Sequence, residues 1–478
     1  MKRVVRIIEN TVSKTKTLIK GGIWYTIGGF LLKGIGFFTA PIFIRLLTTE
    51  EYGITSVYNT WLTLIGTVVM LQVSSSIATA MKDYEGKRFN EYLSSTLTLA
   101  TISSIVFILI MFIFSKELVR LMKLDRTLII LMGINSFFVG NITFISRVCI
   151  REQNHKKYLT ISFLNVILST LISIVLILTF KENKHLGRIF GGAIATALLG
   201  LYSYISILKK TGFRIDIEAW KYCLKISLPM IFHVISTTIL SQSDRIMINN
   251  MIGSSEAGIY SFIYNIGSIL LIITTSFNNA WVPWYYNNLK ENNKDKIKEV
   301  MLKYMFLVTI ISITLMMISP EIVKIMAPKT YWAGIKLVPL LILGGYMTFL
   351  YTFAVNYEIY SKKTKLIACG SIITAIINLI LNLLFIPKYG ATGATLATVI
   401  SYLFLFILHQ YNVRYVMKYK ELELKVYIKY IITITMFVLL SYSIIDIIIL
   451  RVILVILLLA YSVIKLDIYK FIIVLKNK

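Results

Sequence analysis

Residues 21–59 read GGIWYTIGGFLLKGIGFFTAPIFIRLLTTEEYGITSVYN, and this stretch decides the fold. It predicts one long apolar helix, a turn at Glu50-Glu51-Tyr52-Gly53 and the start of a second apolar helix. Apolar segments of about 20 residues are long enough to cross the roughly 30 Å hydrocarbon core of a bilayer. Comparable segments recur to the end of the chain. The sequence therefore predicts a polytopic membrane protein embedded in a lipid bilayer.

The composition supports this class. Hydrophobic residues make up 57% of the chain, charged residues only 15%, and the mean hydropathy is +0.75. Soluble domains carry about 25% charged residues, and no polar segment here is long enough to form one. The net charge of +27 is spread over short loops. In a membrane protein this pattern reports orientation, so we expect no nucleic-acid partner.

The apolar pattern predicts an all-α protein with about fourteen transmembrane helices. The predicted spans are residues 22–46, 54–80, 92–114, 127–149, 158–180, 189–208, 222–250, 258–282, 300–326, 334–358, 365–386, 391–412, 426–445 and 447–464. The predicted parts of the chain are a basic interfacial segment (1–20), an N-terminal six-helix bundle (21–208), a cytoplasmic linker (209–221), a C-terminal six-helix bundle (222–412) and two extra helices with a basic tail (413–478).

The lysines and arginines predict the orientation of these spans. Of the 50 Lys and Arg residues, 35 fall in the termini and in the loops on their side of the membrane, and 13 fall on the opposite side. Lys33 and Arg245 lie within spans. Cytoplasmic loops are the richer in Lys and Arg, so both termini are predicted to be cytoplasmic. Residues 181–188, which include Arg188, are predicted to form an external loop.

The turn before the second span recurs in the second half of the chain. Residues 46–56 align with residues 251–261 at a constant offset of 205, and the Glu, Gly, Ile and Ser are shared. Six predicted spans belong to each half, which is an even number. The two halves are therefore expected to be parallel repeats related by an axis along the membrane normal.

Lys33 is the first candidate for a substrate-binding side chain. It lies near the middle of the first span, on a stripe of small and polar residues: Gly22, Thr26, Gly29, Gly36 and Ala40. Lipid exposure at this depth costs several kcal/mol, so Lys33 is expected to face protein or a water-filled cavity. The alternative is a structural pair with a carboxylate. Arg45, at the outer end of the same span, steers an anion or anchors the helix at the interface.

Span seven carries the second set of candidates. Asp244 and Arg245 are adjacent, roughly two turns inside the outer end of that span. One interpretation is that they neutralise each other or pair with other helices. The other is that Arg245 binds an anion and Asp244 carries a coupling ion. Glu358, near the cytoplasmic end of span ten, is expected to be solvated.

Span two has a polar face made by Asn59, Gln72 and the three serines 74–76. Such a face suits either a cavity or hydrogen bonds between membrane helices. No nucleotide-binding glycine motif, nucleophile elbow or metal-ligand cluster is present in the sequence. The three cysteines, Cys149, Cys223 and Cys369, are far apart. We therefore expect neither an enzyme nor a cofactor or a bound metal.

Several short motifs resemble those of the oligosaccharide flippases, the polysaccharide-biosynthesis branch of the multidrug/oligosaccharidyl-lipid/polysaccharide exporter superfamily. The motifs are Arg45-Leu46-Leu47-Thr48, Glu51-Tyr52-Gly53, Arg151-Glu152-Gln153, Asp244-Arg245 and Ala257-Gly258-Ile259-Tyr260-Ser261. The resemblance covers essentially the whole chain. It implies two six-helix bundles around a cavity lined by spans one, two, seven and eight, with two further C-terminal helices.

The resemblance also implies a function in surface polysaccharide biosynthesis. The implied substrate is an undecaprenyl-pyrophosphate-linked oligosaccharide repeat unit for O-antigen or capsule, moved across the bacterial plasma membrane by alternating access. Lys33, Arg45 and Arg245 would then bind the substrate, because a pyrophosphate crossing hydrocarbon needs compensating positive charge. Asp244 would couple transport to H⁺ or Na⁺, and a polysaccharide polymerase is a candidate partner.

Two alternatives remain open from the sequence. An ion-coupled drug exporter of the same fold should place acidic residues in its cavity, whereas the deepest candidate here is a lysine. A membrane polysaccharide polymerase or acyltransferase should show a large external loop or a catalytic constellation of His, Asp and Arg, and the sequence contains neither.

Overall fold

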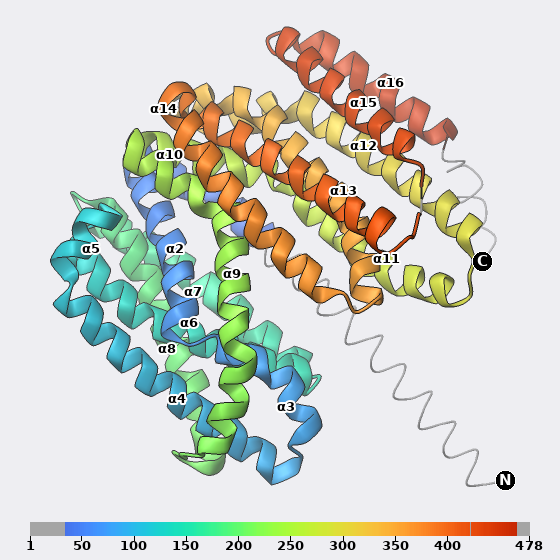
Figure 1. Ribbon diagram of the computed structural model, residues 1–478. Coiled ribbons are helices and arrows are strands. Elements are labelled where there is room, and N and C mark those ends of the chain that lie inside the picture. Colours follow the sequence, from blue (N-terminus) through green and yellow to red (C-terminus); the bar gives the residue numbers. More distant parts are fainter. Residues whose placement is uncertain (1–33, 421, 466–478) are drawn as a thin grey trace. The chain divides into compact units, whose positions relative to one another are not determined.

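The computed structural model describes residues 34–420 and 422–465, and every regular element in these ranges is helical (Figure 1). The helices are α2 (Thr49–Val69), α3 (Ile77–Asp83), α4 (Gly86–Ile113), α5 (Ser115–Met122), α6 (Arg126–Arg151), α7 (His155–Thr179), α8 (Lys184–Thr211), α9 (Ile217–Met251), α10 (Ser254–Gly267), α11 (Ile269–Lys290), α12 (Lys294–Met326), α13 (Val338–Tyr360), α14 (Thr364–Tyr411), α15 (Leu424–Ser443) and α16 (Ile448–Lys465). The all-α prediction is confirmed.

Eleven of the described helices are long and apolar enough to cross a membrane, and a bent pair makes a twelfth. Each predicted span from 54–80 onward overlaps a described apolar helix. The first predicted span is described only from Gly34, as the shorter apolar helix Gly34–Leu46. The total of fourteen spans stays a prediction.

Contacts divide the chain into two compact units, one ending at Thr238 and the other beginning at Ile239, a boundary that lies inside α9. We call them unit 1 and unit 2 and describe each by itself. The predicted linker 209–221 contains the turn between α8 and α9. The predicted domain boundaries stay predictions.

In unit 1, α2 begins with a capping box. The Thr48 side chain accepts a hydrogen bond from the Glu51 backbone N–H, and the Glu51 carboxylate accepts one from the Thr48 N–H. The other oxygen of Glu51 accepts from the Lys184 backbone N–H at 2.7 Å. The first turns of α2 and α8 are therefore held together by one carboxylate, which satisfies N–H groups that a helix start leaves unpaired.

Helices α7 and α8 form a closely packed antiparallel pair in unit 1. A Cβ added to Gly191 of α8 would lie 2.4 Å from the Cα of Ser173 on α7. A side chain larger than that of glycine would not fit at this position. Small residues commonly allow membrane helices to approach each other closely. Helices α2 and α6 also pack against α8, so α8 is central to the unit (Figure 1).

The second predicted span, residues 54–80, is broken into two helices that together are long and apolar enough to cross a membrane. Helix α2 ends at Val69, and the chain continues through a 3₁₀ turn (Val73–Ser76) into α3 with a bend of 60°. Leu71 and Gln72 both adopt the left-handed region, with φ of 48° and 46°. Two consecutive residues in this region cannot continue a right-handed helix.

In unit 2, α10 begins 205 residues after α2, and Glu51 and Glu256 both occupy the third helical position. The repeat in the sequence therefore coincides with two equivalent helix starts. Helix α14 contains two predicted spans because the chain reverses at Gly390 (φ 60°, ψ −141°). A Cβ on Gly393 would lie 2.3 Å from the Phe385 carbonyl oxygen, whereas eight residues of straight helix span about 12 Å.

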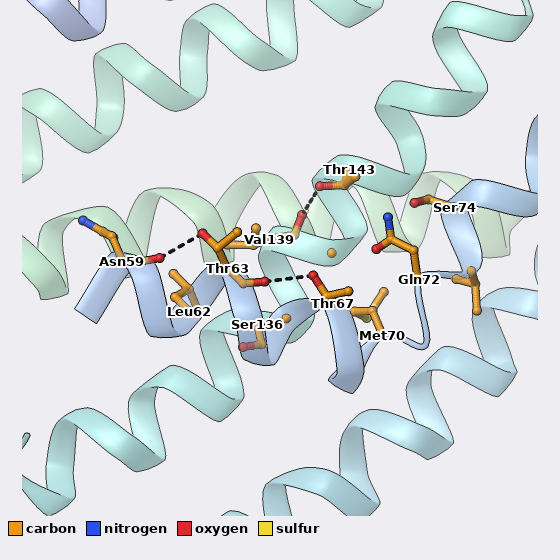
Figure 2. A pocket seen from close by; sticks show the side chains of 13 residues that line it. Asn59, Leu62, Thr63, Thr67, Met70, Gln72, Ser74, Ser136, Val139 and Thr143 are labelled. Atoms are coloured by element: carbon orange, nitrogen blue, oxygen red, sulfur yellow. Dashed lines mark hydrogen bonds between the residues drawn. The ribbon is translucent and has the colours of Figure 1, made fainter. Parts of the chain in front are cut away.

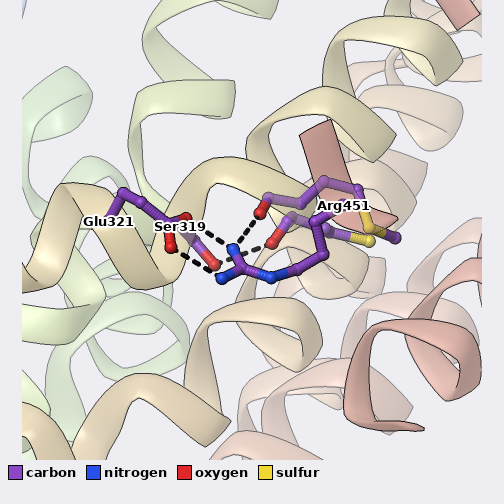
Figure 3. A network of polar contacts seen from close by, with 5 residues as sticks. Ser319, Glu321 and Arg451 are labelled. Carbon is purple, nitrogen blue, oxygen red and sulfur yellow. Dashed lines mark hydrogen bonds and ion pairs between the residues drawn. The ribbon is translucent and has the colours of Figure 1, made fainter. Parts of the chain in front are cut away.

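Helices α15 and α16 pack against α12, and a buried arginine joins α16 to it (Figures 1 and 3). Arg451 is 3% exposed and donates from Nη1 and Nη2 to the two carboxylate oxygens of Glu321, at 2.5 and 2.6 Å. Nη1 also donates to the Met317 carbonyl oxygen at 2.6 Å. A two-pronged pair of this kind fixes the position of α16 along α12.

Glu358 of α13 was expected to be solvated, and this expectation was wrong. Its side chain is 0% exposed, and one oxygen lies 2.8 Å from Nδ1 of His409, which is 1% exposed. Asn412 donates to the other oxygen at 3.2 Å. Packing of α14 onto α13 buries the carboxylate together with His409 and Asn412. The position of Glu358 near a helix end in the sequence does not indicate this burial.

Candidate functional site

Unit 1 contains a polar cavity of about 290 Å³ beside the break in α2 (Figure 2). Its walls come from α2, from the break and from α6. The lining residues are Asn59, Leu62, Thr63, Gly66, Thr67, Met70, Gln72, Val73, Ser74, Ser136, Val139, Gly140 and Thr143. The polar face predicted for span two therefore lines a cavity.

The threonines and the amides in this cavity play different parts. Thr63 and Thr67 donate to carbonyl oxygens four residues earlier in α2, at 2.9 Å each (Figure 2). Their hydroxyl protons are thus used inside the helix. The side-chain amides of Asn59 and Gln72 make no hydrogen bond to other described residues. These two amides are available to a ligand.

The break itself supports a binding role for this cavity. At membrane depth, irregular backbone is tolerated only where protein or water satisfies its polar groups. Here Ser103 of α4 donates to the Val69 carbonyl oxygen at 2.9 Å. Discontinuous membrane helices are a recurrent feature of transporter binding sites.

A second cavity, of about 210 Å³, lies at the other end of α2 and shares Asn59, Leu62 and Val139 with the first. Arg188 is one of its lining residues. The sequence pattern predicts an external loop at Arg188, but α8 begins at Lys184 and contains this residue. The spacing of Arg188, Gly192 and Thr196 by four residues was the signal that this polar stripe belongs to a helix.

In unit 2, Asp244 is 1% exposed and accepts hydrogen bonds from three neutral side chains. Tyr260 donates at 2.6 Å, Thr398 at 2.7 Å and Asn382 at 2.7 Å. They come from α10 and from both arms of α14, so the carboxylate ties three segments of the unit together. A buried carboxylate needs such donors, because burial without them costs several kcal/mol.

Arg245 is half-buried and has separate neighbours. Its guanidinium carbon lies 4.8 Å from the centroid of the Tyr264 ring, and Nη1 donates to Gln242 at 3.3 Å. Its Nε is buried without a hydrogen-bond partner. Among the described residues, no ion pair joins Arg245 to Asp244 or to any other carboxylate. The two side chains thus have different hydrogen-bond and ring partners in the structure.

The two remaining candidates are placed as follows. Arg45 is an exposed residue near the end of the helix Gly34–Leu46. Lys33 lies outside the described residues. The roles predicted for Lys33, Arg45, Asp244 and Arg245 stay predictions.

Apolar membrane-length helices and a broken helix beside a cavity are the arrangement found in many membrane transporters. Comparison with known families specifies the class. The model of the polysaccharide biosynthesis protein family matches residues 18–289, more than half of the chain, and the MatE model matches residues 229–384. The chain belongs to the polysaccharide biosynthesis protein family.

Two relatives are similar along most of their length. Protein 1 of the Lsg locus of Haemophilus influenzae is 25% identical over 369 residues, which cover 75% of this chain and 89% of the relative. The capsular polysaccharide biosynthesis protein CapF of Staphylococcus aureus is 23% identical over 372 residues, covering 75% and 90%.

Solved structures show the same fold. The lipid II flippase MurJ in an inward closed conformation superposes with a TM-score of 0.73 and 17% identity, over 94% of this chain and all of that chain. An inward-facing multidrug resistance MATE family transporter superposes with a TM-score of 0.66 and 13% identity, over 81% and 96%. The chain thus has the fold of these multi-pass membrane proteins, and it belongs to a polysaccharide biosynthesis family.

Proposed function

We propose that the protein is a flippase that moves undecaprenyl-pyrophosphate-linked oligosaccharide repeat units across the bacterial plasma membrane by alternating access, with both termini cytoplasmic. Family membership supports the biosynthetic role, and the name of the relative CapF supports a surface polysaccharide as the end product. The lipid-linked substrate agrees with the name of the structural neighbour, a lipid II flippase.

One observation carries the proposal. Arg245 is a half-buried arginine in a membrane-spanning helix whose guanidinium has no carboxylate partner among the described residues. Such a cation is costly unless it serves an anionic ligand. A pyrophosphate supplies that anion, and arginine binds phosphate oxygens with two parallel N–H donors. Lys33 and Arg45 are proposed as further cations for the substrate.

The cavities of unit 1 argue against a drug exporter that carries cations. Among the residues that the structure describes, neither lining contains an Asp or a Glu, and Arg188 is the only charged side chain in the two. The match of the MatE model to residues 229–384 is the observation that favours an ion-coupled drug exporter. One transport experiment therefore tests both candidate functions, the flippase and the ion-coupled drug exporter.

The experiment measures translocation of an undecaprenyl-pyrophosphate-linked oligosaccharide in proteoliposomes, beside efflux of a cationic dye. The parent protein is expected to move the lipid-linked substrate, and Arg245→Ala to abolish this transport at normal protein level. Lys303→Ala is the control, because Lys303 is exposed and makes only a surface pair with Glu299. Dye efflux without transport of the lipid-linked glycan would contradict the flippase proposal and support an ion-coupled drug exporter.

Asp244 is proposed as the carrier of the coupling ion, H⁺ or Na⁺. Its three hydrogen-bond donors are neutral, so the carboxylate charge is not cancelled within its contacts. The amide oxygen of Asn382 is buried without a hydrogen-bond partner, and a cavity of about 20 Å³ lies against Thr398. A small cation or a water molecule fits such a space.

Asp244→Asn keeps the size of the side chain and removes its charge. We expect this variant to bind the lipid-linked substrate but to lose the response to an imposed proton or sodium gradient. Moving one charge through 100 mV is worth about 2.3 kcal/mol, so the parent response should be large. If the variant responds to the gradient as the parent does, Asp244 is structural and the coupling site lies elsewhere.

A further inference from the structure

The cavity around Arg188 is a second place where unit 1 could meet a substrate. Besides Arg188, its lining is neutral: Thr55, Tyr58, Asn59, Leu62, Asn135, Val139, Ser169, Ile189, Gly192, Ala193 and Thr196. The cavity thus combines a single positive charge with several amides and hydroxyls.

The Arg188 side chain is held in a defined position. Nη1 donates to the Ser173 hydroxyl oxygen at 3.1 Å, and that hydroxyl donates to the Arg188 carbonyl oxygen at 3.1 Å. The guanidinium carbon lies 3.5 Å from the centroid of the Phe43 ring. Phe43 covers one side of the guanidinium. Of the five N–H groups of the guanidinium, one donates to Ser173.

The charge of Arg188 is not neutralised within the described part of the chain. No ion pair joins it to a carboxylate there. An oriented guanidinium with unused N–H groups at a cavity is suited to a planar two-oxygen anion, since carboxylate and phosphate oxygens match its geometry. The cavity is therefore expected to take an anionic group.

The neutral walls decide which anion fits. Thr196 donates to the Asn135 amide oxygen at 2.5 Å. The amide N–H₂ of Asn135 has two N–H groups, one of which is directed to Tyr58 and the other of which can donate to a ligand. Asn59 contributes a second uncommitted amide. A pyrophosphate carries at least two charges, and the described residues of the lining include no second cation. A sugar ring with one carboxylate matches both the single charge and the amides, which can pair with ring hydroxyls.

The size of the cavity supports this choice. Its volume of about 210 Å³ is below the roughly 300–1,000 Å³ of pockets that take drug-sized ligands. It therefore suits one sugar residue and not a whole lipid-linked headgroup. Leu62, Val139 and Ile189 offer apolar wall to the C–H groups of a sugar ring.

We infer that the Arg188 cavity binds a carboxylate-bearing sugar, such as a hexuronic acid, within the transported glycan. This inference rests on the proposed function and deepens it, since it specifies the chemical class of the repeat unit. Arg188 pairs with the sugar carboxylate, and Asn59 and Asn135 with the hydroxyls of the same ring.

The test uses two synthetic undecaprenyl-pyrophosphate-linked disaccharides that differ only in one sugar, glucuronic acid in one and glucose in the other. In proteoliposomes, the parent is expected to transport the acidic compound at least about tenfold faster. The preference reflects one charge-assisted pair. Arg188→Gln is expected to reduce the ratio of the two rates to near one, by slowing the acidic compound.

The control is Arg126→Gln. Arg126 is an arginine of the same unit whose side chain bonds Ser115 and lies over Phe112, away from the cavity. This variant should keep the preference. Equal rates for the two compounds in the parent, or an equal loss for both in Arg188→Gln, would overturn the inference, since a structural or pyrophosphate-binding arginine does not discriminate the sugars.

A binding measurement separates this inference from the proposed function. Purified protein in detergent is titrated with the two free disaccharides by calorimetry. The parent should bind the acidic one at least about tenfold more tightly, and Arg188→Gln should lose that difference. If neither lipid-linked compound is transported, the flippase proposal fails, while this titration still decides on the acidic-sugar site.

Discussion

Asp244 and Arg245 are neighbours in sequence but have different partners in space. Successive residues of an α-helix point about 100° apart. The carboxylate of Asp244 accordingly meets Tyr260, Asn382 and Thr398, whereas the guanidinium of Arg245 lies over Tyr264. The two side chains are not directly paired in this structure. Any switch that changes the interaction between Asp244 and Arg245 therefore requires a bound ligand or a conformational change.

The first prediction concerns the buried pair of Glu358 and His409. Glu358→Ala removes the acceptor of Asn412 and the carboxylate next to His409, so we expect the free energy of unfolding to fall by about 1–3 kcal/mol, the cost of leaving a buried polar group unsatisfied. The midpoint of thermal unfolding of the detergent-purified protein measures this. The control Glu358→Gln keeps an acceptor for Asn412 and should lose less.

The double variant Glu358→Ala/His409→Ala tests whether the two side chains act as a unit. Its loss should be smaller than the sum of the two single losses, because residues in one network are not additive. Additive losses would contradict a direct interaction between the two groups.

At the scale of helices, two local features shape unit 1. The left-handed residues at the break in α2 redirect the chain by 60° and leave Gln72 and Ser74 at the cavity. The glycines of α8 bring that helix against α7, and Arg188 lies on the turn just before Gly191 and Gly192. The position of Arg188 relative to Ser173 thus depends on how closely the two helices approach.

The second prediction uses two adjacent glycines of α8. A Cβ on Gly191 would lie 2.4 Å from the backbone of Ser173, whereas a Cβ on Gly192 meets only the Ser169 hydroxyl oxygen, at 3.5 Å. Gly191→Ala should therefore separate the helices and lower the free energy of unfolding by about 1–3 kcal/mol, the usual cost of overpacking. Thermal unfolding in detergent checks this.

Gly192→Ala is the matched control for that experiment. It adds the same methyl group to the same helix at a position with room, so its unfolding temperature should equal or exceed that of the parent, because alanine favours the helix over glycine. Equal destabilisation by both substitutions would show that the close contact between α7 and α8 is not what requires Gly191.

For the whole molecule, orientation in the membrane is the property that the function depends on most. The excess of Lys and Arg predicts which loops are cytoplasmic. Residues 82–90, 209–221 and 290–298 are expected inside, and residues 181–188 and 327–333 outside. The connections between the described helices fall in or next to these ranges, so exposed side chains in them can be labelled.

The third prediction is the labelling pattern of single cysteines. With Cys149, Cys223 and Cys369 replaced, a cysteine is introduced at one of four exposed positions: Lys87, Glu182, Lys296 or Thr330. An impermeant thiol reagent added to intact cells should label only the variants at positions 182 and 330. The other two should be labelled after permeabilisation. Labelling at position 296 from outside would show that the second half of the chain has the opposite orientation. It would contradict the prediction of parallel repeats.

The sequence by itself determined the class of protein, the helices and much of the repeat. Hydrocarbon thickness sets the length of an apolar segment, and the backbone must then be helical, since no water is there to bond it. Local signals determined the helix starts, as the capping box of Thr48 and Glu51 shows. The polar face of span two was also readable, and it lines a cavity.

Only the tertiary structure decided the partners of the polar groups. The burial of Glu358 beside His409, the bonds of Asp244 to Asn382 and Thr398, and the contact of Arg188 with Phe43 join residues that are 51 or more positions apart in the chain. The bonds of Asp244 to Tyr260 and of Arg188 to Ser173 join neighbouring helices, over 16 and 15 positions. Periodicity tells which face of a helix is polar, but not which helix covers that face. That choice depends on close packing between segments distant in sequence, and it determines whether a charge is paired, solvated or left for a ligand.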